Sequence, residues 1–102
     1  VLEYSGEAVE AMSMEERMTM CNMSIEAGAT SGLISPDQTT IDYLWGRENI
    51  TKDKSEFDKL KVKWLSYASD KGAKYDNEIT LDANSLEPQV TWGINPGEVC
   101  NI

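Results

Sequence analysis

The order of secondary-structure signals predicts an α/β fold, with helices layered on both sides of a small mixed or mostly parallel sheet. The signals run strand, helix, strand, two helices and two strands, and the first helix is long enough for a crossover between the first two strands. A chain of 102 residues can form one such domain and is too short for two. We therefore expect residues 1–102 to form a single α/β domain.

Two short runs of strand-forming residues predict the first pair of strands. Val1 to Tyr4 is closed by the turn residues Ser5 and Gly6, and Leu33 with Ile34 forms the core of a later strand. A connection that contains a helix joins neighbouring strands in parallel, whereas antiparallel neighbours need only a tight turn. We therefore expect these two runs to form a parallel pair.

A capping signal marks the start of the first helix. Ser13 is followed three residues later by Glu16, the spacing at which each side chain binds a free backbone N–H of the other residue. The predicted helix runs from Met14 to Ala27 and stops at Gly28. Two adjacent stripes run along this predicted helix, because apolar and polar residues each repeat at intervals of three and four. The apolar stripe contains Met14, Met18, Cys21 and Ile25, and the polar stripe contains Glu15, Thr19, Asn22 and Glu26.

Two further helices are predicted in the middle of the chain. One runs from Pro36 to Trp45, with Ser35 as its N-cap, and ends at Gly46. The other begins at Ser55 and stops before Gly72. Apolar residues at helical spacing face inward on this last helix, and lysines between them face water. The inward residues are Phe57, Leu60, Trp64 and Ala68, and the lysines are Lys59, Lys61 and Lys63.

Two strands are predicted towards the C-terminal end. From Tyr75 to Leu81 the residue types alternate in the pattern of a half-buried strand with one solvent-exposed face. Gln89 to Trp92 predicts a last short strand. No apolar run approaches the roughly 18 residues of a membrane span.

The chain carries a large excess of negative charge. It has 18 acidic residues against 9 Lys and Arg, which gives a formal net charge of −9. Nucleic-acid backbones and anionic membrane surfaces both require a positive footprint, so we expect neither as a partner. All lysines lie between Lys52 and Lys74, so a basic patch could form only there.

The chain has no histidine, and it therefore lacks the commonest general base and metal ligand. Proton chemistry would depend on carboxylates, Tyr, Lys or groups outside the chain. Cys21 and Cys100 are far apart in sequence and form no CxxC pair, so neither a zinc site nor a disulfide framework is indicated. This use of cysteine favours the cytoplasm.

Asn22 and Glu26 are the candidate functional residues. Four residues apart on the predicted helix, they would project side by side, so that an amide and a carboxylate could converge on one ligand atom. The alternative is that both simply face solvent, which is the commoner reason for a polar stripe. Asparagine in mid-helix favours a function, because its helix propensity is poor and Ala or Lys would serve solvent equally well.

Several separate motifs follow one another along the chain. They are Ser5-Gly6-Glu7-Ala8, Ser13 to Thr19, Cys21 to Ala29, Ser35 to Thr40, Tyr43-Leu44, Gly72 to Asp76, Val90 to Gly93 and Asn95 to Gly97. In residue type and order these motifs resemble the second domain of the aconitase family, and within it most closely the branch that isomerises isopropylmalate. The resemblance covers nearly the whole chain and implies the layered fold of that domain.

The resemblance implies a part of a hydro-lyase that interconverts 2-isopropylmalate and 3-isopropylmalate in leucine biosynthesis. Family members use a [4Fe-4S] cluster that is held by three cysteines, with the fourth iron acting as a Lewis acid. Neither Cys21 nor Cys100 matches a cluster-ligand motif, so we expect the cluster to be ligated outside this chain. The implied partners are the remaining domains of a large subunit, a separate small subunit and a small hydroxy-acid substrate.

The resemblance also implies roles for the two candidate residues. Asn22 corresponds to an amide in the cluster environment that is not a ligand, and Glu26 to a carboxylate that exchanges a proton as hydroxide leaves or adds. Because the chain opens without Met and lacks the cluster cysteines, we expect a fragment of a larger multidomain subunit that is inactive by itself. The alternatives are homoaconitase or another hydratase of the family and, in a different class, an acidic non-catalytic protein-interaction module.

Overall fold

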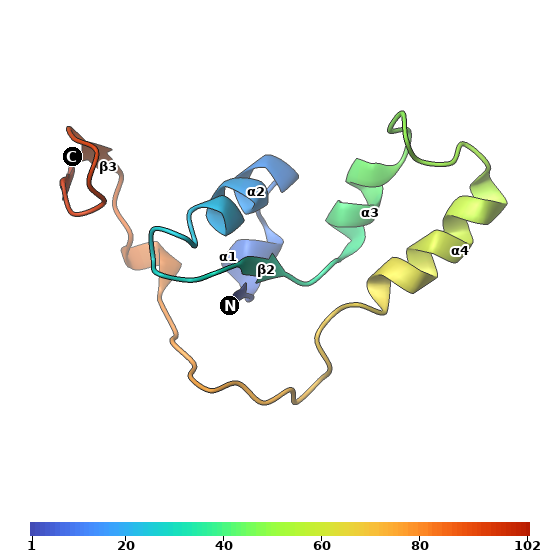
Figure 1. Cartoon of the computed structure of the whole chain (residues 1–102), viewed down its shortest axis with the longest axis horizontal. Coiled ribbons are helices and arrows are strands. Elements are labelled where there is room, and N and C mark those ends of the chain that lie inside the picture. The colour runs from blue at the N-terminus through green and yellow to red at the C-terminus, as the bar shows by residue number, and fades with distance from the viewer.

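The elements follow the predicted order as far as the last long helix, with one short helix added, and depart from it after that helix. The computed structural model describes residues 1–102. Its elements are β1 (Leu2–Tyr4), α1 (Glu7–Glu10), α2 (Met14–Asn22), β2 (Gly32–Ile34), α3 (Gln38–Leu44), α4 (Lys54–Leu65), the 3-10 turn η1 (Ala83–Ser85), β3 (Gln89–Thr91) and β4 (Val99–Asn101). The strands form two separate two-stranded sheets, one parallel and one antiparallel. Together with the helices, these sheets confirm the predicted α/β class. Helix α4 and the C-terminal hairpin lie at opposite ends of the molecule (Figure 1).

The parallel pair that the sequence predicts is present. β1 and β2 pair in parallel with Leu2 opposite Gly32, and α1 and α2 form the connection between them. The backbone of β2 comes very close to the end of α2. A Cβ on Gly32 would overlap the Ser24 hydroxyl and lie 2.9 Å from the Cα of Cys21. Glycine is therefore required for this close approach.

Helix α2 begins where it is predicted to begin and ends earlier. In the capping box, the Ser13 N–H donates to the Glu16 carboxylate at 2.8 Å, and the Ser13 hydroxyl accepts from the Glu16 N–H. The predicted end at Ala27 is wrong, because the helix stops at Asn22 and the chain continues through turns to Gly28. Gly28 has the left-handed φ of 83° that a stop residue requires, but it closes these turns instead of the helix.

The one buried residue of α2 does not belong to the apolar stripe. Arg17 is 3% exposed, whereas Met14 and Cys21 are half-buried and Met18 and Ile25 are exposed. Arg17 lies three residues after Met14 and four before Cys21, so it falls on the same face of the helix. The apolar face therefore carries a buried charge, and such a charge requires a partner.

Helix α3 has a different N-cap from the predicted one. Asp37 takes this position in place of Ser35, because its carboxylate accepts a hydrogen bond from the Thr40 N–H at 3.1 Å. The predicted start at Pro36 is consequently wrong, and the helix begins at Gln38. The Ser35 hydroxyl instead accepts a hydrogen bond from the chain beyond α4. Gly46, where the helix is predicted to end, follows it with a left-handed φ of 83°.

An aromatic cluster joins α3 to α4. The Phe57 ring of α4 lies edge-to-face against Trp45, with ring centroids 4.6 Å apart, and against Trp64, with centroids 5.8 Å apart. Aromatic rings favour this geometry because the positive edge of one meets the negative face of the other. Phe57 and Ile41 of α3 are the most buried apolar side chains of the molecule, and the inward position of Phe57 is as predicted.

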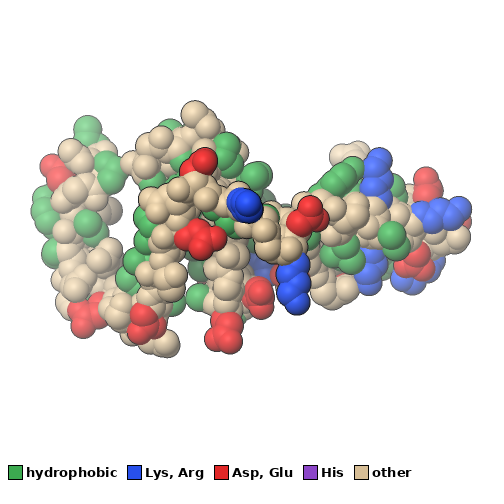
Figure 2. Space-filling model, turned by 90° about the horizontal axis from the view of Figure 1, so that it is seen from below, with side chains coloured by type: hydrophobic (Ala, Val, Ile, Leu, Met, Phe, Trp, Pro, Cys, Tyr) green, Lys and Arg blue, Asp and Glu red, His purple; other side chains and the backbone are tan.

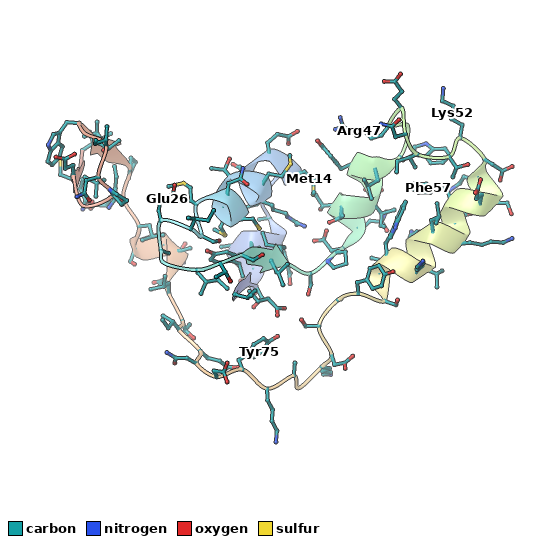
Figure 3. All side chains as sticks on the ribbon, viewed as in Figure 1. Met14, Glu26, Arg47, Lys52, Phe57 and Tyr75 are labelled. Carbon is teal, nitrogen blue, oxygen red and sulfur yellow. The ribbon has the colours of Figure 1, made fainter.

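The chain between α4 and β3 forms no strand. The predicted strand from Tyr75 to Leu81 is wrong, because this segment has no pairing partner and its side chains are exposed. An alternating pattern becomes a strand only where a neighbouring strand can receive it. The segment instead runs as a long loop that carries Tyr75 away from the helices (Figures 1 and 3).

The last predicted strand is confirmed and belongs to a hairpin. Gln89 to Trp92 is the predicted range, and β3 covers Gln89–Thr91. Its antiparallel partner β4 pairs Cys100 with Val90. β4 has no counterpart among the predicted elements, and neither does the short helix α1.

Much of the molecule's apolar surface is uncovered. The Cα radius of gyration is 16.5 Å, against about 13 Å for a compact domain of this size. The accessible surface is 8422 Å², against about 5,800 Å² for a compact monomer of the same mass. Exposed apolar residues of the C-terminal third include Ile79, Leu81, Leu86, Trp92, Ile94 and Ile102. Apolar surface on this scale is typical of regions that contact other protein.

The cationic side chains are unevenly distributed over the surface. Figure 2 shows most of the visible Lys and Arg side chains at the α3–α4 end, where acidic side chains lie among them, while the charged side chains elsewhere on this face are mostly acidic. Lys59 and Lys63 of α4 are exposed as predicted, and Lys61 is half-buried. None of the helices has the length and apolar character needed to cross a bilayer.

Phe57→Ala should loosen α4 from α3, because it removes both edge-to-face contacts of the aromatic cluster. Truncation of a buried Phe costs about 3–5 kcal/mol. In hydrogen–deuterium exchange, the amides of α4 should lose protection while those of α2 keep it. Val62→Ala is the matched control, since Val62 lies on the same helix and is 71% exposed. An equal loss of protection in both variants would contradict the role of Phe57.

Candidate functional site

The two candidate residues lie at the same end of α2. Asn22 is the last residue of the helix, and Glu26 lies in the turns that follow. The predicted placement of both on one helix face is therefore wrong for Glu26. Figure 3 shows Glu26 beyond the helix, at the opposite end from Met14. Both side chains are exposed, so both are accessible to groups outside the chain.

Ser24 fixes the turn that carries Glu26. Its side chain is fully buried, and its hydroxyl lies 2.8 Å from the Tyr4 hydroxyl of β1 and 3.3 Å from the Met20 carbonyl oxygen of α2. The Ser24 N–H bonds to the Cys21 carbonyl, one residue closer than a helical bond requires. These bonds compete with the helical pattern, which explains why α2 ends early.

Arg17 joins three segments around α2. Its guanidinium donates two parallel hydrogen bonds to the Asp37 carboxylate, each 2.8 Å long. It also donates to the carbonyl oxygens of Glu10, at 2.9 Å, and Met12, at 3.2 Å. The planar fork of arginine suits a bidentate pair with a carboxylate. One side chain therefore connects the end of α1, the middle of α2 and the start of α3.

The contact between Arg17 and Asp37 shifts the ionisation equilibrium of each group towards its charged form. The hydrogen bonds from Arg17 hold the pKa of the Asp37 carboxyl below its ordinary value, although burial acts in the opposite direction. The hydrogen bond to Asp37 raises the pKa of the Arg17 guanidinium. Both groups consequently stay charged together over the neutral range.

The sequence predictions include no role for Arg17, Asp37 or Ser24. Two signals could have identified them. Arg17 and Ser24 are polar residues that fall on the apolar face of the predicted helix, where a buried partner is required. Asp37 precedes Thr40 by the three residues of a capping pattern.

A shallow groove of about 290 Å³ lies between α2 and the start of α3. Its lining consists of Met14, Arg17, Met18, Cys21, Asn22, Ile34, Pro36 and Thr40. Arg17 and Thr40 are both hydrogen-bonded to Asp37. The Asn22 amide, which can donate and accept, is therefore the polar group available to a ligand at this groove.

A second and larger groove, of about 530 Å³, lies along α2 and includes neither candidate residue. Tyr4, Glu15, Glu16, Thr19, Met20 and Met23 line it. Its two carboxylates would repel an anionic ligand. Of these two grooves, only the one beside Asn22 includes a candidate residue.

The chain's own side chains do not fit a [4Fe-4S] cluster as ligands. Such a cluster is held by thiolates, and no group of three or more His, Cys, Asp or Glu side chains is placed to hold a metal ion. Cys21 is half-buried on α2, and Cys100 is exposed on β4. A cluster beside this segment would need ligands from elsewhere.

Comparison with known proteins assigns the chain to a class. The model of the aconitase family (aconitate hydratase) matches residues 1–102, and the chain therefore belongs to the aconitase family. A relative named 3-isopropylmalate dehydratase large subunit, from Oceanobacillus iheyensis, is 62% identical over 97 residues. The match covers 95% of this chain and 20% of the relative, so the chain spans about a fifth of that protein's length. No solved structure matches the chain.

Acid should weaken the pair between Arg17 and Asp37. Because the fold lowers the pKa of Asp37, the pair's contribution is complete above the unfolded value of about 3.9 and is lost as pH falls through the lowered pKa. Asp37→Asn should therefore be less stable than the wild type by about 2 kcal/mol at pH 6. In denaturant unfolding followed by circular dichroism, this difference should shrink below pH 4. A difference that is constant down to pH 2 would contradict the prediction.

Proposed function

We propose that residues 1–102 are part of a hydro-lyase that interconverts 2-isopropylmalate and 3-isopropylmalate by removing and adding water, a step of leucine biosynthesis. The observation that carries this proposal is the 62% identity, over 95% of the chain, to the relative named 3-isopropylmalate dehydratase large subunit. Since the chain spans about a fifth of that relative, the remaining parts would complete the site. By itself the chain would be inactive.

Glu26 is proposed to move one of the two protons of this reaction, the one that joins the departing hydroxyl group, while a separate base would take the proton that leaves carbon. In dehydration a carboxylic acid gives a proton to the departing hydroxyl group, and in the reverse direction the carboxylate takes one from the water that adds. Glu26 is exposed on a turn that Ser24 anchors to β1, which supports this role because an acid–base group must be accessible and firmly placed.

Asn22 is proposed to supply an amide to the same site. Its position on the groove beside α2 supports this role, because the amide is available there for hydrogen bonds to groups outside the chain. It would lie in the cluster environment without being a ligand. Its hydrogen bonds would orient the groups that Glu26 protonates.

A [4Fe-4S] cluster is proposed to be held by cysteines outside this chain. When bound, it supplies a Lewis acid for the reaction. The substrate is an anion, and its carboxylates also need cations from elsewhere. Arg17 is paired with Asp37, and most other cations lie at the α3–α4 end (Figure 2).

The proposed partners are the remainder of a large subunit and a separate small subunit. The relative's name, which includes the words large subunit, supports the second partner. The uncovered apolar residues of the C-terminal third support the first, because contact with the rest of the subunit would bury them. We place the enzyme in the cytoplasm, since both cysteines are free thiols.

The full-length protein, produced with its small subunit and loaded with its cluster, tests the proposal. It should interconvert the two isopropylmalates, as measured by chromatography of the products. Turnover of a homocitrate-type or citrate-type acid, with none of isopropylmalate, would assign a different hydratase of the family. Absence of turnover with all three acids would contradict an enzymatic role.

Glu26→Gln in this assembled enzyme should lower turnover by at least about a hundredfold, because the amide cannot exchange a proton. The absorption spectrum of the cluster should stay intact, which separates loss of chemistry from loss of assembly. Glu15→Gln is the matched control, since Glu15 is an exposed carboxylate at the other end of α2. Near-normal turnover of Glu26→Gln would rule out the role.

Asn22→Ala should lower turnover or shorten the lifetime of the cluster in air, because a hydrogen bond in its surroundings is lost. Thermal unfolding should change little, since Asn22 is exposed at the end of its helix. Thr19→Ala provides a control on the same polar stripe. If both the rate and the cluster lifetime are unchanged in Asn22→Ala, the assignment is wrong.

A further inference from the structure

The ion pair between Arg17 and Asp37 is placed to determine where the candidate residues lie. Arg17 is in the middle of α2, and Asn22 is the last residue of the same helix. A regular helix is stiff over this distance, so a change in the tilt of α2 at Arg17 moves its end. Arg17 and Asn22 also line the same groove, together with residues at the start of α3.

Besides the pair, one side-chain hydrogen bond holds the turn at the end of α2, on the side of β1. The hydroxyl pair of Ser24 and Tyr4 ties the turn after α2 to β1. This bond does not join α2 to α3, whose start lies against α2. The bonds between Arg17 and Asp37 supply that second attachment, and they are direct, short and bidentate. Two attachments on different sides define the position of a helix end more closely than one.

We propose that Arg17 and Asp37 are positioning residues of the proposed active site, and that their pair sets the placement of Asn22 and Glu26. Neither residue needs to touch the substrate. This inference rests on the proposed function, since it assigns the pair an effect on turnover. Its physical basis is that a misplacement of about 1 Å in a catalytic group can lower the rate by as much as a hundredfold.

Three substitutions in the assembled, cluster-loaded enzyme test the pair. Asp37→Asn keeps the size and the capping oxygen but removes the charge, and Arg17→Lys keeps the charge but loses the fork. Each should lower kcat by about ten- to a hundredfold per intact cluster and change KM by less than about threefold. Asp37→Glu retains the charge and should recover much of the loss seen with Asp37→Asn.

Two matched variants separate positioning from general stability. Asp58→Asn breaks the exposed Lys54–Asp58 pair and should leave kcat unchanged. Ser13→Ala removes the cap at the other end of α2 and should lower the thermal midpoint with little effect on kcat at 25 °C. If Ser13→Ala lowers kcat as much as Arg17→Lys does, the pair acts through stability and the proposal is overturned.

A double-variant cycle shows whether the pair acts through Glu26. Arg17→Lys should reduce kcat much less in the Glu26→Gln background than in the wild type, because the group that it positions is already inactive. Full additivity would overturn the proposal. A kcat within twofold of wild type in both Arg17→Lys and Asp37→Asn would overturn it too, even where Glu26→Gln abolishes turnover. If all three pair variants fail to assemble while Ser13→Ala assembles, a role confined to positioning is excluded.

If Glu26→Gln retains turnover, the failure belongs to the proposed function. That result concerns the chemistry of one carboxylate. The positioning proposal fails by a different result, normal turnover of the pair variants. The two proposals can therefore be rejected separately.

Discussion

One buried guanidinium organises the N-terminal half of the molecule. Arg17 is the only charged side chain that the fold withdraws almost completely from water, and its desolvation is offset only when acceptors surround it. Asp37 and the carbonyl oxygens of Glu10, at the end of α1, and of Met12 provide those acceptors. An apolar side chain could pack in several orientations, whereas this set of directional bonds is satisfied in one. The pair therefore mainly fixes the relative positions of the segments that it joins. Its net contribution to the free energy of unfolding is modest, because its bonds largely offset the cost of removing the charges from water.

The buried polar groups and the exposed candidate residues alternate along the chain. Arg17 and Ser24 are the two buried polar side chains. Asn22 lies between them, and Glu26 follows two residues after Ser24. Side chains that must meet a substrate have to stay exposed, so packing of their own cannot hold them in place. Their positions depend instead on neighbouring backbone that buried hydrogen bonds fix.

Local signals in the sequence predict the first half of this arrangement, and long-range contacts determine the remainder. The capping box at Ser13 and the parallel pairing of β1 with β2 follow from spacing and from the crossover rule, and both are confirmed. The end of α2 depends on the hydrogen bond between Ser24 and the hydroxyl of Tyr4, which lies twenty residues earlier. No local sequence pattern predicts a contact over that separation. The strand predicted from Tyr75 to Leu81 has a suitable pattern but no neighbouring strand within the chain. The roles of Asn22 and Glu26 remain predictions, since they come from the family's motif and not from a bound ligand.

The charge distribution defines what this segment can and cannot contribute to the proposed reaction. The net charge of −9 opposes binding of an anionic hydroxy acid, and the guanidinium nearest to Asn22 is occupied by Asp37. Arg47 and Lys52 lie towards the opposite end of the molecule from Glu26 (Figure 3). Under the proposed function, the segment would therefore contribute proton transfer, for which a carboxylate is sufficient, and would not hold the substrate's carboxylates. In the proposed enzyme those two tasks fall to different parts of the protein, so that Glu26 acts only when other segments bring a bound anion to it.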